Sequence, residues 1–173
     1  MDLNQYIRTI PDFPEPGIQF RDITTLIGNA AAFRYTIDCL AERYDAGVVD
    51  AVAGIESRGF IFGAALADRL QLPLVPIRKE GKLPYTTMRQ EYALEYGQGV
   101  VEIHRDALDS GRQVLLVDDL LATGGTLLAS AKLVEMLGAV VHECAVVIEL
   151  PALGGRGRLR DYRVFSMVAF EGE

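Results

Sequence analysis

The sequence predicts a single α/β domain in which helices flank a mainly parallel central sheet. Three observations lead to this fold class. Segments with the periodicity of strands and of helices alternate along the chain, which is typical of βαβ units. The segment 114–117 is apolar at every position, as expected for a central strand that helices cover on both faces. A length of 173 residues suits one domain, 1–173.

The expected elements can be placed in order from caps, periodicity and breakers. Two prolines within 13–17 predict a rigid, irregular connector there, because each fixes its own backbone and restricts the residue before it. Asn29 is a typical N-cap for an amphipathic helix that Gly47 would end. Further helices are expected at 58–70 and 124–137, and strands at 48–55, 74–77, 100–103, 114–117 and 140–150.

The segment 79–97 is polar and aromatic, and it is long for a simple connection. Loops of more than about 12 to 15 residues are uncommon in compact domains, and many of them close over a site. We therefore expect a flexible lid over about residues 79–97.

Composition excludes several classes of partner. The chain has 17 Lys and Arg against 24 Asp and Glu, a formal net charge of −7, so nucleic acid and anionic membranes are poor partners. No apolar run approaches the roughly 18 residues that span a bilayer, and no signal-peptide pattern opens the chain. Cys39 and Cys144 match no metal or disulfide spacing, and Arg156, Arg158 and Arg160 indicate a solvated turn. These features predict a cytoplasmic protein without nucleic-acid or membrane partners.

The segment 114–126 carries the strongest chemical signal. Its apolar strand ends at two carboxylates, Asp118 and Asp119, and a short loop of alanine, threonine and glycine then opens a helix. The backbone N–H groups of such a loop, the helix N-terminus and the threonine hydroxyls together suit a phosphomonoester. Two carboxylates beside that anion site are natural acceptors for a vicinal diol. The combination indicates a ribose 5-phosphate.

Other signatures are missing from the sequence. The segment 54–59 has the two glycines of a P-loop, but Phe60 and Ile61 stand where lysine and serine or threonine are required. No G-x-G-x-x-G or G-x-S-x-G pattern occurs. These observations argue against a nucleoside-triphosphate hydrolase, a dinucleotide-binding protein and a serine hydrolase. Taken alone, the acidic pair could be a simple turn and the glycine-threonine loop could be ordinary helix capping. Their occurrence together, directly after a buried strand, is poorly explained in this way.

The segment 114–126 resembles the 5-phosphoribosyl 1-pyrophosphate signature of type I phosphoribosyltransferases. The chain as a whole is similar to the adenine phosphoribosyltransferase family, in order and over nearly its full length. The resemblance implies a type I phosphoribosyltransferase-like core with an N-terminal base-binding hood over about residues 1–30 and a mobile lid loop. It rests on the segments 13–24, 54–60, 78–84, 94–97 and 148–155.

The resemblance implies an enzyme of purine salvage. Adenine would react with 5-phosphoribosyl 1-pyrophosphate to give AMP and pyrophosphate, with Mg²⁺ on the donor and no metal ligand from the protein, in a homodimer. Two alternatives remain open: a type I phosphoribosyltransferase for hypoxanthine, guanine, xanthine or orotate, and a non-catalytic sensor of the donor that regulates transcription. The hood and the segment 94–97 favour adenine, and a single acidic domain argues against a DNA-binding regulator.

Roles for individual residues are implied by the same resemblance. Arg58 and Glu95 are the implied catalytic residues: Arg58 would stabilise the leaving pyrophosphate, and Glu95 would manage a proton on the imidazole edge of adenine. Asp118 and Asp119 would bind the ribose 3- and 2-hydroxyls. The other implied contacts are Ala122, Thr123, Gly124, Gly125 and Thr126 to the 5-phosphate, Glu56, Ser57, Lys79 and Lys82 around pyrophosphate, with the lysines from the same or a neighbouring subunit, and Gln19, Arg21 and Leu150 to the base.

Overall fold

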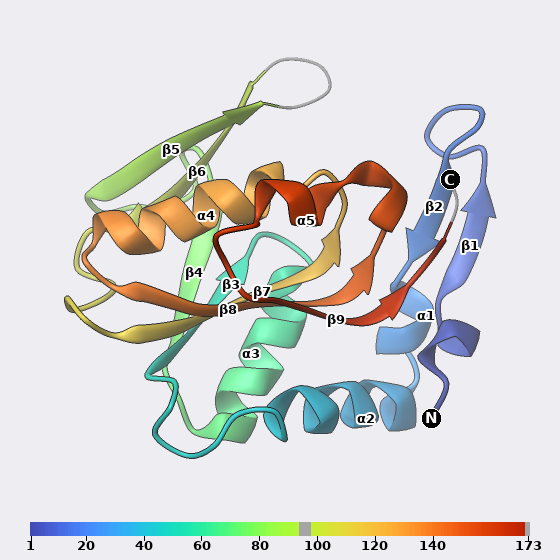
Figure 1. The fold of residues 1–173 in the computed structure, drawn as a ribbon, viewed down its shortest axis with the longest axis horizontal. Helices are drawn as coiled ribbons and strands as arrows, with labels where there is room; N and C mark the ends of the chain where they lie inside the picture. The colour runs from blue at the N-terminus through green and yellow to red at the C-terminus, as the bar shows by residue number, and fades with distance from the viewer. Residues whose placement is uncertain (94–97, 172–173) are drawn as a thin grey trace.

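The computed structural model describes residues 1–93 and 98–171, and Figure 1 shows its architecture. The described residues form a seven-stranded sheet, in which a parallel block is extended at one edge by an antiparallel hairpin. The expected mainly parallel sheet is thus confirmed. In spatial order its strands are β5 (Thr87–Ala93), β6 (Gln98–His104), β4 (Leu74–Lys79), β3 (Ala51–Ile55), β7 (Gln113–Leu121), β8 (Val140–Glu149) and β9 (Val164–Ala169).

Helices cover both faces of this sheet (Figure 1). The helices α2 (Ala30–Ala41) and α3 (Gly59–Leu70) lie on one face, and α4 (Gly125–Met136) and α5 (Gly155–Arg158) lie on the other. Successive side chains of a strand point to opposite faces, so Leu115 of β7 packs in the core with α2 and α3, whereas Leu116 packs in the core with α4. Burial on both faces explains why 114–117 is apolar throughout.

The first long helix begins where the sequence predicts but ends earlier. The Asn29 side chain accepts hydrogen bonds from the N–H groups of Ala31 and Ala32 at 3.1 and 3.0 Å, so it caps α2. The helix ends at Ala41 rather than at Gly47, and β3 begins at Ala51 rather than at residue 48. The apolar pattern runs past these ends because side chains of the connection, such as Tyr44, also pack on the core.

The N-terminal segment forms a small antiparallel hairpin of β1 (Arg8–Pro11) and β2 (Gln19–Asp22), between η1 (Leu3–Tyr6) and α1 (Thr24–Ile27). The proline-containing connector 13–17 joins these two strands, which the sequence analysis missed. Asp22 fastens the hairpin, because its carboxylate accepts hydrogen bonds from the Thr24 hydroxyl at 2.7 Å and from Arg8 Nη2 at 2.5 Å. Those bonds lower the pKa of Asp22 to about 2.

The segment 79–97 is not one continuous loop. Its described part contains β5, which pairs with β6 from Thr87 opposite His104 to Ala93 opposite Gln98. As an edge strand, β5 exposes polar side chains to solvent, so it lacks the apolar run by which a central strand is recognised. The role of this segment as a lid stays a prediction. Among the described residues, no helix is long and apolar enough to cross a membrane.

Candidate active site

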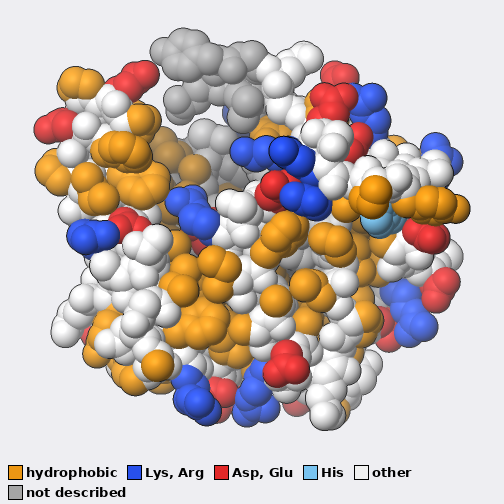
Figure 2. All heavy atoms as spheres, turned by 180° about the vertical axis from the view of Figure 1, so that it is seen from behind, with side chains coloured by type: hydrophobic (Ala, Val, Ile, Leu, Met, Phe, Trp, Pro, Cys, Tyr) orange, Lys and Arg blue, Asp and Glu red, His pale blue; other side chains and the backbone are white. Residues whose placement is uncertain are grey.

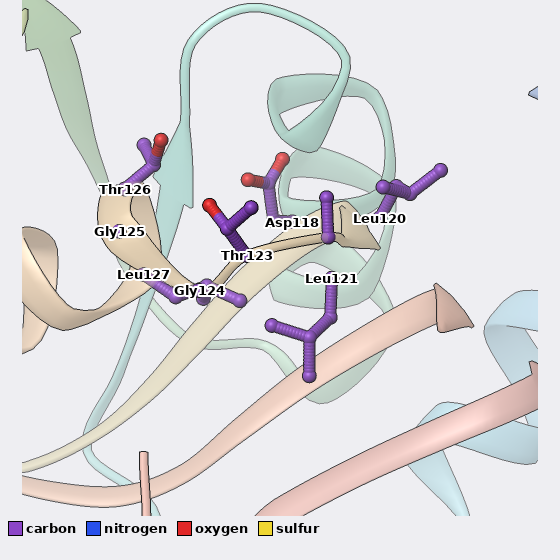
Figure 3. A pocket seen from close by; sticks show the side chains of 9 residues that line it. Asp118, Leu120, Leu121, Thr123, Gly124, Gly125, Thr126 and Leu127 are labelled. Carbon is purple, nitrogen blue, oxygen red and sulfur yellow. The ribbon is translucent and has the colours of Figure 1, made fainter. Parts of the chain in front are cut away.

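A pocket opens where β7 ends and α4 begins. It is lined by Asp118 and by the continuous segment 120–127. Figure 3 shows the oxygen atoms of Asp118, Thr123 and Thr126 on one side of this segment. Parallel α/β sheets bind ligands at this edge, outside the carboxyl ends of the strands. The structure therefore brings together the carboxylate and the loop that the sequence singled out.

The loop 122–126 has the features of an anion site. Gly124 has a φ of +80°, a left-handed conformation that favours glycine. The helix α4 begins at the next residue without a side-chain cap, and the first N–H groups of a helix carry partial positive charge and have no partner within the helix. Thr123 and Thr126 add two hydroxyl donors beside these N–H groups. This arrangement fits a phosphate group.

Two adjacent carboxylates and one arginine lie together at the pocket, which Asp118 lines. Asp119 is 4% exposed, and its Oδ2 lies 2.7 Å from Arg58 Nε. Burial, and then repulsion from Asp119, raises the pKa of Asp118 well above its ordinary value. Burial also raises the pKa of Asp119, although the Arg58 guanidinium opposes that shift. One arginine thus partly neutralises two adjacent acids, of which Asp119 is buried and Asp118 lines the pocket.

Arg58 reaches the acidic pair because α3 begins directly against the end of β7. A Cβ atom at Gly59 would lie 2.8 Å from Asp118 Oδ1 and 2.9 Å from the carbonyl oxygen of Val117, so a larger residue there would push the helix away. The Phe20 ring of β2 lies 5.8 Å from the Arg58 guanidinium carbon. The N-terminal hairpin, α3 and β7 therefore meet at Arg58.

Glu56 binds protein groups. Its carboxylate accepts a hydrogen bond from the Lys79 N–H at 3.0 Å and two bonds from the Arg78 guanidinium at 3.3 Å each. Burial disfavours the charge of Glu56, but these bonds and the charge of Arg78 outweigh it, so the pKa of Glu56 lies below its usual value. The neighbouring Ser57 is exposed, as are Lys79 and Lys82. Glu56 thus supports the turn that carries the two predicted pyrophosphate lysines.

The residues predicted to meet the base come from two parts of the fold, Gln19 and Arg21 from β2 and Leu150 from the end of β8. Gln19 begins β2 and is partly buried. The Arg21 guanidinium lies over the Phe170 ring, 4.3 Å from its centre, so its side chain joins β2 to the C-terminal segment. Leu150 follows β8, and its N–H donates to the Leu121 carbonyl at 2.9 Å. Because Leu121 lines the pocket, Leu150 is tied to the pocket wall.

The turn at α5 supports the phosphate loop, which the sequence analysis did not predict. A Cβ atom at Gly155 would overlap the carbonyl oxygen of Ala122, and one at Gly124 would lie 2.8 Å from the Gly155 carbonyl oxygen. Arg156 fixes this turn with two bonds of 2.7 Å to the buried Glu149. The turn is exposed as expected and the Arg156 side chain is 50% exposed, but Arg156 also supports the loop through Glu149.

The predicted catalytic Glu95, with the rest of 94–97, lies outside the described residues, and its role stays a prediction. The chain leading to it is described up to Ala93. A Cβ atom at Gly125 would lie 3.3 Å from the Ala93 carbonyl oxygen and 3.4 Å from Tyr92 Cδ2. The end of β5 therefore packs against the phosphate loop.

The fold and this pocket define a phosphoribosyltransferase, and residues 27–172 match the family model described as phosphoribosyl transferase domain. The chain is 62% identical over 169 residues to the adenine phosphoribosyltransferase of Chloroflexus aurantiacus, with 98% of each chain covered. It belongs to the adenine phosphoribosyltransferase family, which confirms the resemblance seen in the sequence.

Solved structures agree with this assignment. The adenine phosphoribosyltransferase of Thermoanaerobacter pseudethanolicus is 50% identical, with a TM-score of 0.94 and 98% of both chains covered. That of Saccharomyces cerevisiae, complexed with adenine and an imino-altritol bisphosphate, is 38% identical, with a TM-score of 0.92 and coverage of 96% of this chain and 97% of that one. The type I phosphoribosyltransferase fold is thus confirmed.

We predict that Asp118→Asn stabilises the free protein. The substitution removes one charge from the buried pair, and the asparagine Oδ1 can still accept the 2.9 Å hydrogen bond from the Asp119 N–H. A carboxyl whose pKa is raised by folding destabilises the folded state once the pH exceeds its unfolded pKa, and this cost grows until the pH passes its folded pKa. The advantage of the variant should therefore be small near pH 4 and reach about 2 to 4 °C in Tm at pH 8. Thermal melts at both pH values, with the exposed Asp106→Asn as control, test this; a Tm at pH 8 equal to that of the wild type would contradict it.

We predict that Gly155→Ala distorts the phosphate loop. Overpacking of a closely packed contact costs about 1 to 3 kcal/mol, so Tm should fall and the KM for 5-phosphoribosyl 1-pyrophosphate should rise roughly tenfold. Gly157→Ala is the matched control in the same helix, since a Cβ atom there has no neighbour within 4 Å. Melting curves and initial rates for both variants provide the measurement. Equal behaviour of the two variants would show that the close contact at Gly155 does not shape the loop.

Proposed function

We propose that this chain transfers the 5-phosphoribosyl group of 5-phosphoribosyl 1-pyrophosphate to adenine, giving AMP and pyrophosphate in purine salvage. The observation that carries the proposal is one pocket lined by the Asp118 carboxylate and a phosphate loop, with the ion pair of Asp119 and Arg58 at the adjacent residue, in a chain that belongs to the adenine phosphoribosyltransferases. Enzymes of this family are transferases. A homologue from Trypanosoma brucei has been solved with AMP, pyrophosphate and ribose-5-phosphate, which are the two products of this reaction and the phosphoribosyl part of the donor.

The donor is held at both ends of its ribose in this proposal. The loop 122–126 binds the 5-phosphate through its N–H groups and threonine hydroxyls, and Asp118 and Asp119 accept hydrogen bonds from the ribose hydroxyls. The ion pair of Asp119 with Arg58 supports this arrangement, because it places a cation next to the diol site. Binding the diol and the pyrophosphate together would move Arg58 from Asp119 toward the leaving group.

Transfer exchanges one bond at C1 of the ribose for another. The C1–O bond to pyrophosphate breaks, its electron pair leaves with pyrophosphate, and N9 of adenine forms the C1–N bond while adenine gives up one proton. Arg58, Lys79 and Lys82 stabilise the negative charge that develops on the leaving group, and such electrostatic stabilisation commonly contributes most to the rate enhancement. Glu95 is the proposed proton acceptor, and main-chain groups near Gln19 and Arg21 recognise adenine, with Leu150 against its ring.

We also propose Mg²⁺ as the cofactor. Magnesium is usually held by substrate phosphates together with waters and few protein groups, so the pyrophosphoryl oxygens of the donor would supply its ligands, and the negative charge of Asp118 and Asp119 beside the phosphate loop favours a divalent cation there without a direct protein ligand. When bound to the donor, the ion neutralises charge on the pyrophosphoryl group.

A homodimer and a cytoplasmic location complete the proposal. Figure 2 shows apolar side chains gathered on one face of the molecule. Ile61 and Leu74 are 40% and 38% exposed, and exposed apolar side chains of this kind support association between copies. Light scattering after size exclusion measures the mass of the assembly in solution.

The cytoplasmic location is supported by Cys39 and Cys144, which are free thiols, as is usual in a reducing compartment. Fractionation of cells that produce the protein tests the location.

The decisive experiment is pyrophosphate release from the donor and Mg²⁺ with adenine, hypoxanthine, guanine, xanthine or orotate. We expect release with adenine alone, because the whole chain is similar to adenine phosphoribosyltransferases. Release with another base would replace the adenine assignment, and donor binding without release under any base would favour the sensor.

We predict that Arg58→Ala lowers kcat by about a hundredfold, because the leaving pyrophosphate loses its guanidinium, while the KM for adenine changes little. Arg160→Ala is the control, since the Arg160 side chain is 82% exposed. Steady-state rates with each substrate varied provide the measurement. Unchanged kcat in a folded Arg58→Ala protein would remove Arg58 from the reaction.

A further inference from the structure

The turn 79–82, which follows β4, is held in one conformation by backbone contacts. Gly81 has a φ of +74°, the left-handed region that favours glycine. The Lys82 N–H donates to the Lys79 carbonyl at 3.3 Å, and the Glu80 N–H donates to the Val100 carbonyl of β6 at 3.2 Å. Two exposed lysines thus project from a tight turn that is anchored to the sheet.

Three side chains form hydrogen bonds with the backbone of this turn. Glu56 accepts from the N–H of the first turn residue at 3.0 Å, and Arg78 Nη1 donates to the Lys82 carbonyl at 2.9 Å. The third is Glu102 of β6, whose Oε2 accepts from the Gly81 N–H at 3.0 Å. The beginning, the middle and the end of the turn each have their own anchor.

Glu102 is the unexpected member of this set. It is 5% exposed, and burying a carboxylate is costly unless the charge is paired and hydrogen-bonded. Its Oε1 lies 3.5 Å from Arg89 Nε, and its register places it opposite Arg78 on one neighbouring strand and opposite Arg89 on the other. Arg89 therefore balances the charge of Glu102, while Oε2 of Glu102 accepts the hydrogen bond from Gly81.

We propose that Glu102 is a positioning residue that fixes the backbone carrying Lys79 and Lys82, so that both ammonium groups are held ready for one polyanion. The inference rests on the proposed function, because that function assigns pyrophosphate to the two lysines. Both lysine side chains are long and exposed, and each loses rotamer freedom when it binds an anion. A fixed backbone limits that loss to the side chains themselves, which is the advantage of preorganisation.

Two conservative substitutions separate the reach of Glu102 from its charge. Glu102→Asp keeps the charge but withdraws the carboxylate by one methylene from the Gly81 N–H. Glu102→Gln removes the charge but keeps the reach and one acceptor oxygen. We expect Glu102→Asp to raise the KM for the donor and the inhibition constant of pyrophosphate about tenfold, with the KM for adenine unchanged, whereas Glu102→Gln should stay within about twofold of the wild type.

Gly81→Ala tests the same contact from the other partner. A Cβ atom at Gly81 has no neighbour within 4 Å, so no clash is introduced, but alanine disfavours the φ of +74°. The turn should rearrange while Glu102 remains intact, and the KM for the donor should rise as in Glu102→Asp. This variant keeps the test valid even where Glu102→Asp does not fold.

Glu91→Gln is the matched control, because Glu91 is an exposed carboxylate on the adjacent strand β5; its constants should equal those of the wild type. A wild-type donor KM in folded Glu102→Asp, or an equal rise in the Asp and Gln variants, would overturn the inference and leave the proposed function intact. Absence of turnover in the wild-type protein with adenine would instead overturn the proposed function. In a Lys79→Ala, Lys82→Ala background, Glu102→Asp should have no further effect on the donor KM; an additive effect would show that Glu102 acts elsewhere.

Discussion

The ion pair between Arg58 and Asp119 is the contact on which the arrangement of the site depends. Asp118 and Asp119 share the end of a buried strand, where two neighbouring negative charges are unfavourable without a cation. Arg58, at the start of α3, supplies that cation, with its Nε 2.7 Å from Asp119 Oδ2. Balancing the charge of the two acids therefore requires that the start of α3 lies against the end of β7. In the proposed reaction the pyrophosphate of the donor competes with Asp119 for the same guanidinium.

Backbone contacts without intervening side chains make this meeting possible. At Gly59 a Cβ atom would lie 2.9 Å from the Val117 carbonyl oxygen, and at Gly124 it would lie 2.8 Å from the Gly155 carbonyl oxygen, so two helices and the phosphate loop approach to backbone distance. Sites whose supporting shell is rigid hold their ligands with less reorganisation. Gly59 and Gly155, which lie outside the phosphate loop, therefore shape the pocket as Gly124 does within the loop.

The sequence predicted the parts of the fold whose causes are local. The apolar run 114–117 and the N-cap at Asn29 each need a few neighbouring residues, and the structure has the strand and the cap where they were expected. The acidic pair, expected at the end of the strand, lies inside β7, which continues to Leu121. The strand β5 was missed because it is held by pairing with β6, not by an apolar face of its own. The contact of Arg156 with Glu149 was missed for a similar reason, since Glu149 lies on the preceding strand, where no spacing rule indicates a contact.

An acidic chain that binds a polyanion must keep its negative charges from repelling the ligand. The formal net charge is −7, yet the proposed donor carries a phosphate and a pyrophosphate. Three of the carboxylates near the site, those of Glu56, Glu102 and Asp119, are each engaged by an arginine or by a backbone N–H group. Their charge is balanced within the protein, where a short distance makes the attraction strong, whereas Lys79 and Lys82 project into solvent. The same acids that give the chain its overall sign thus build the local basic surface that its substrate requires.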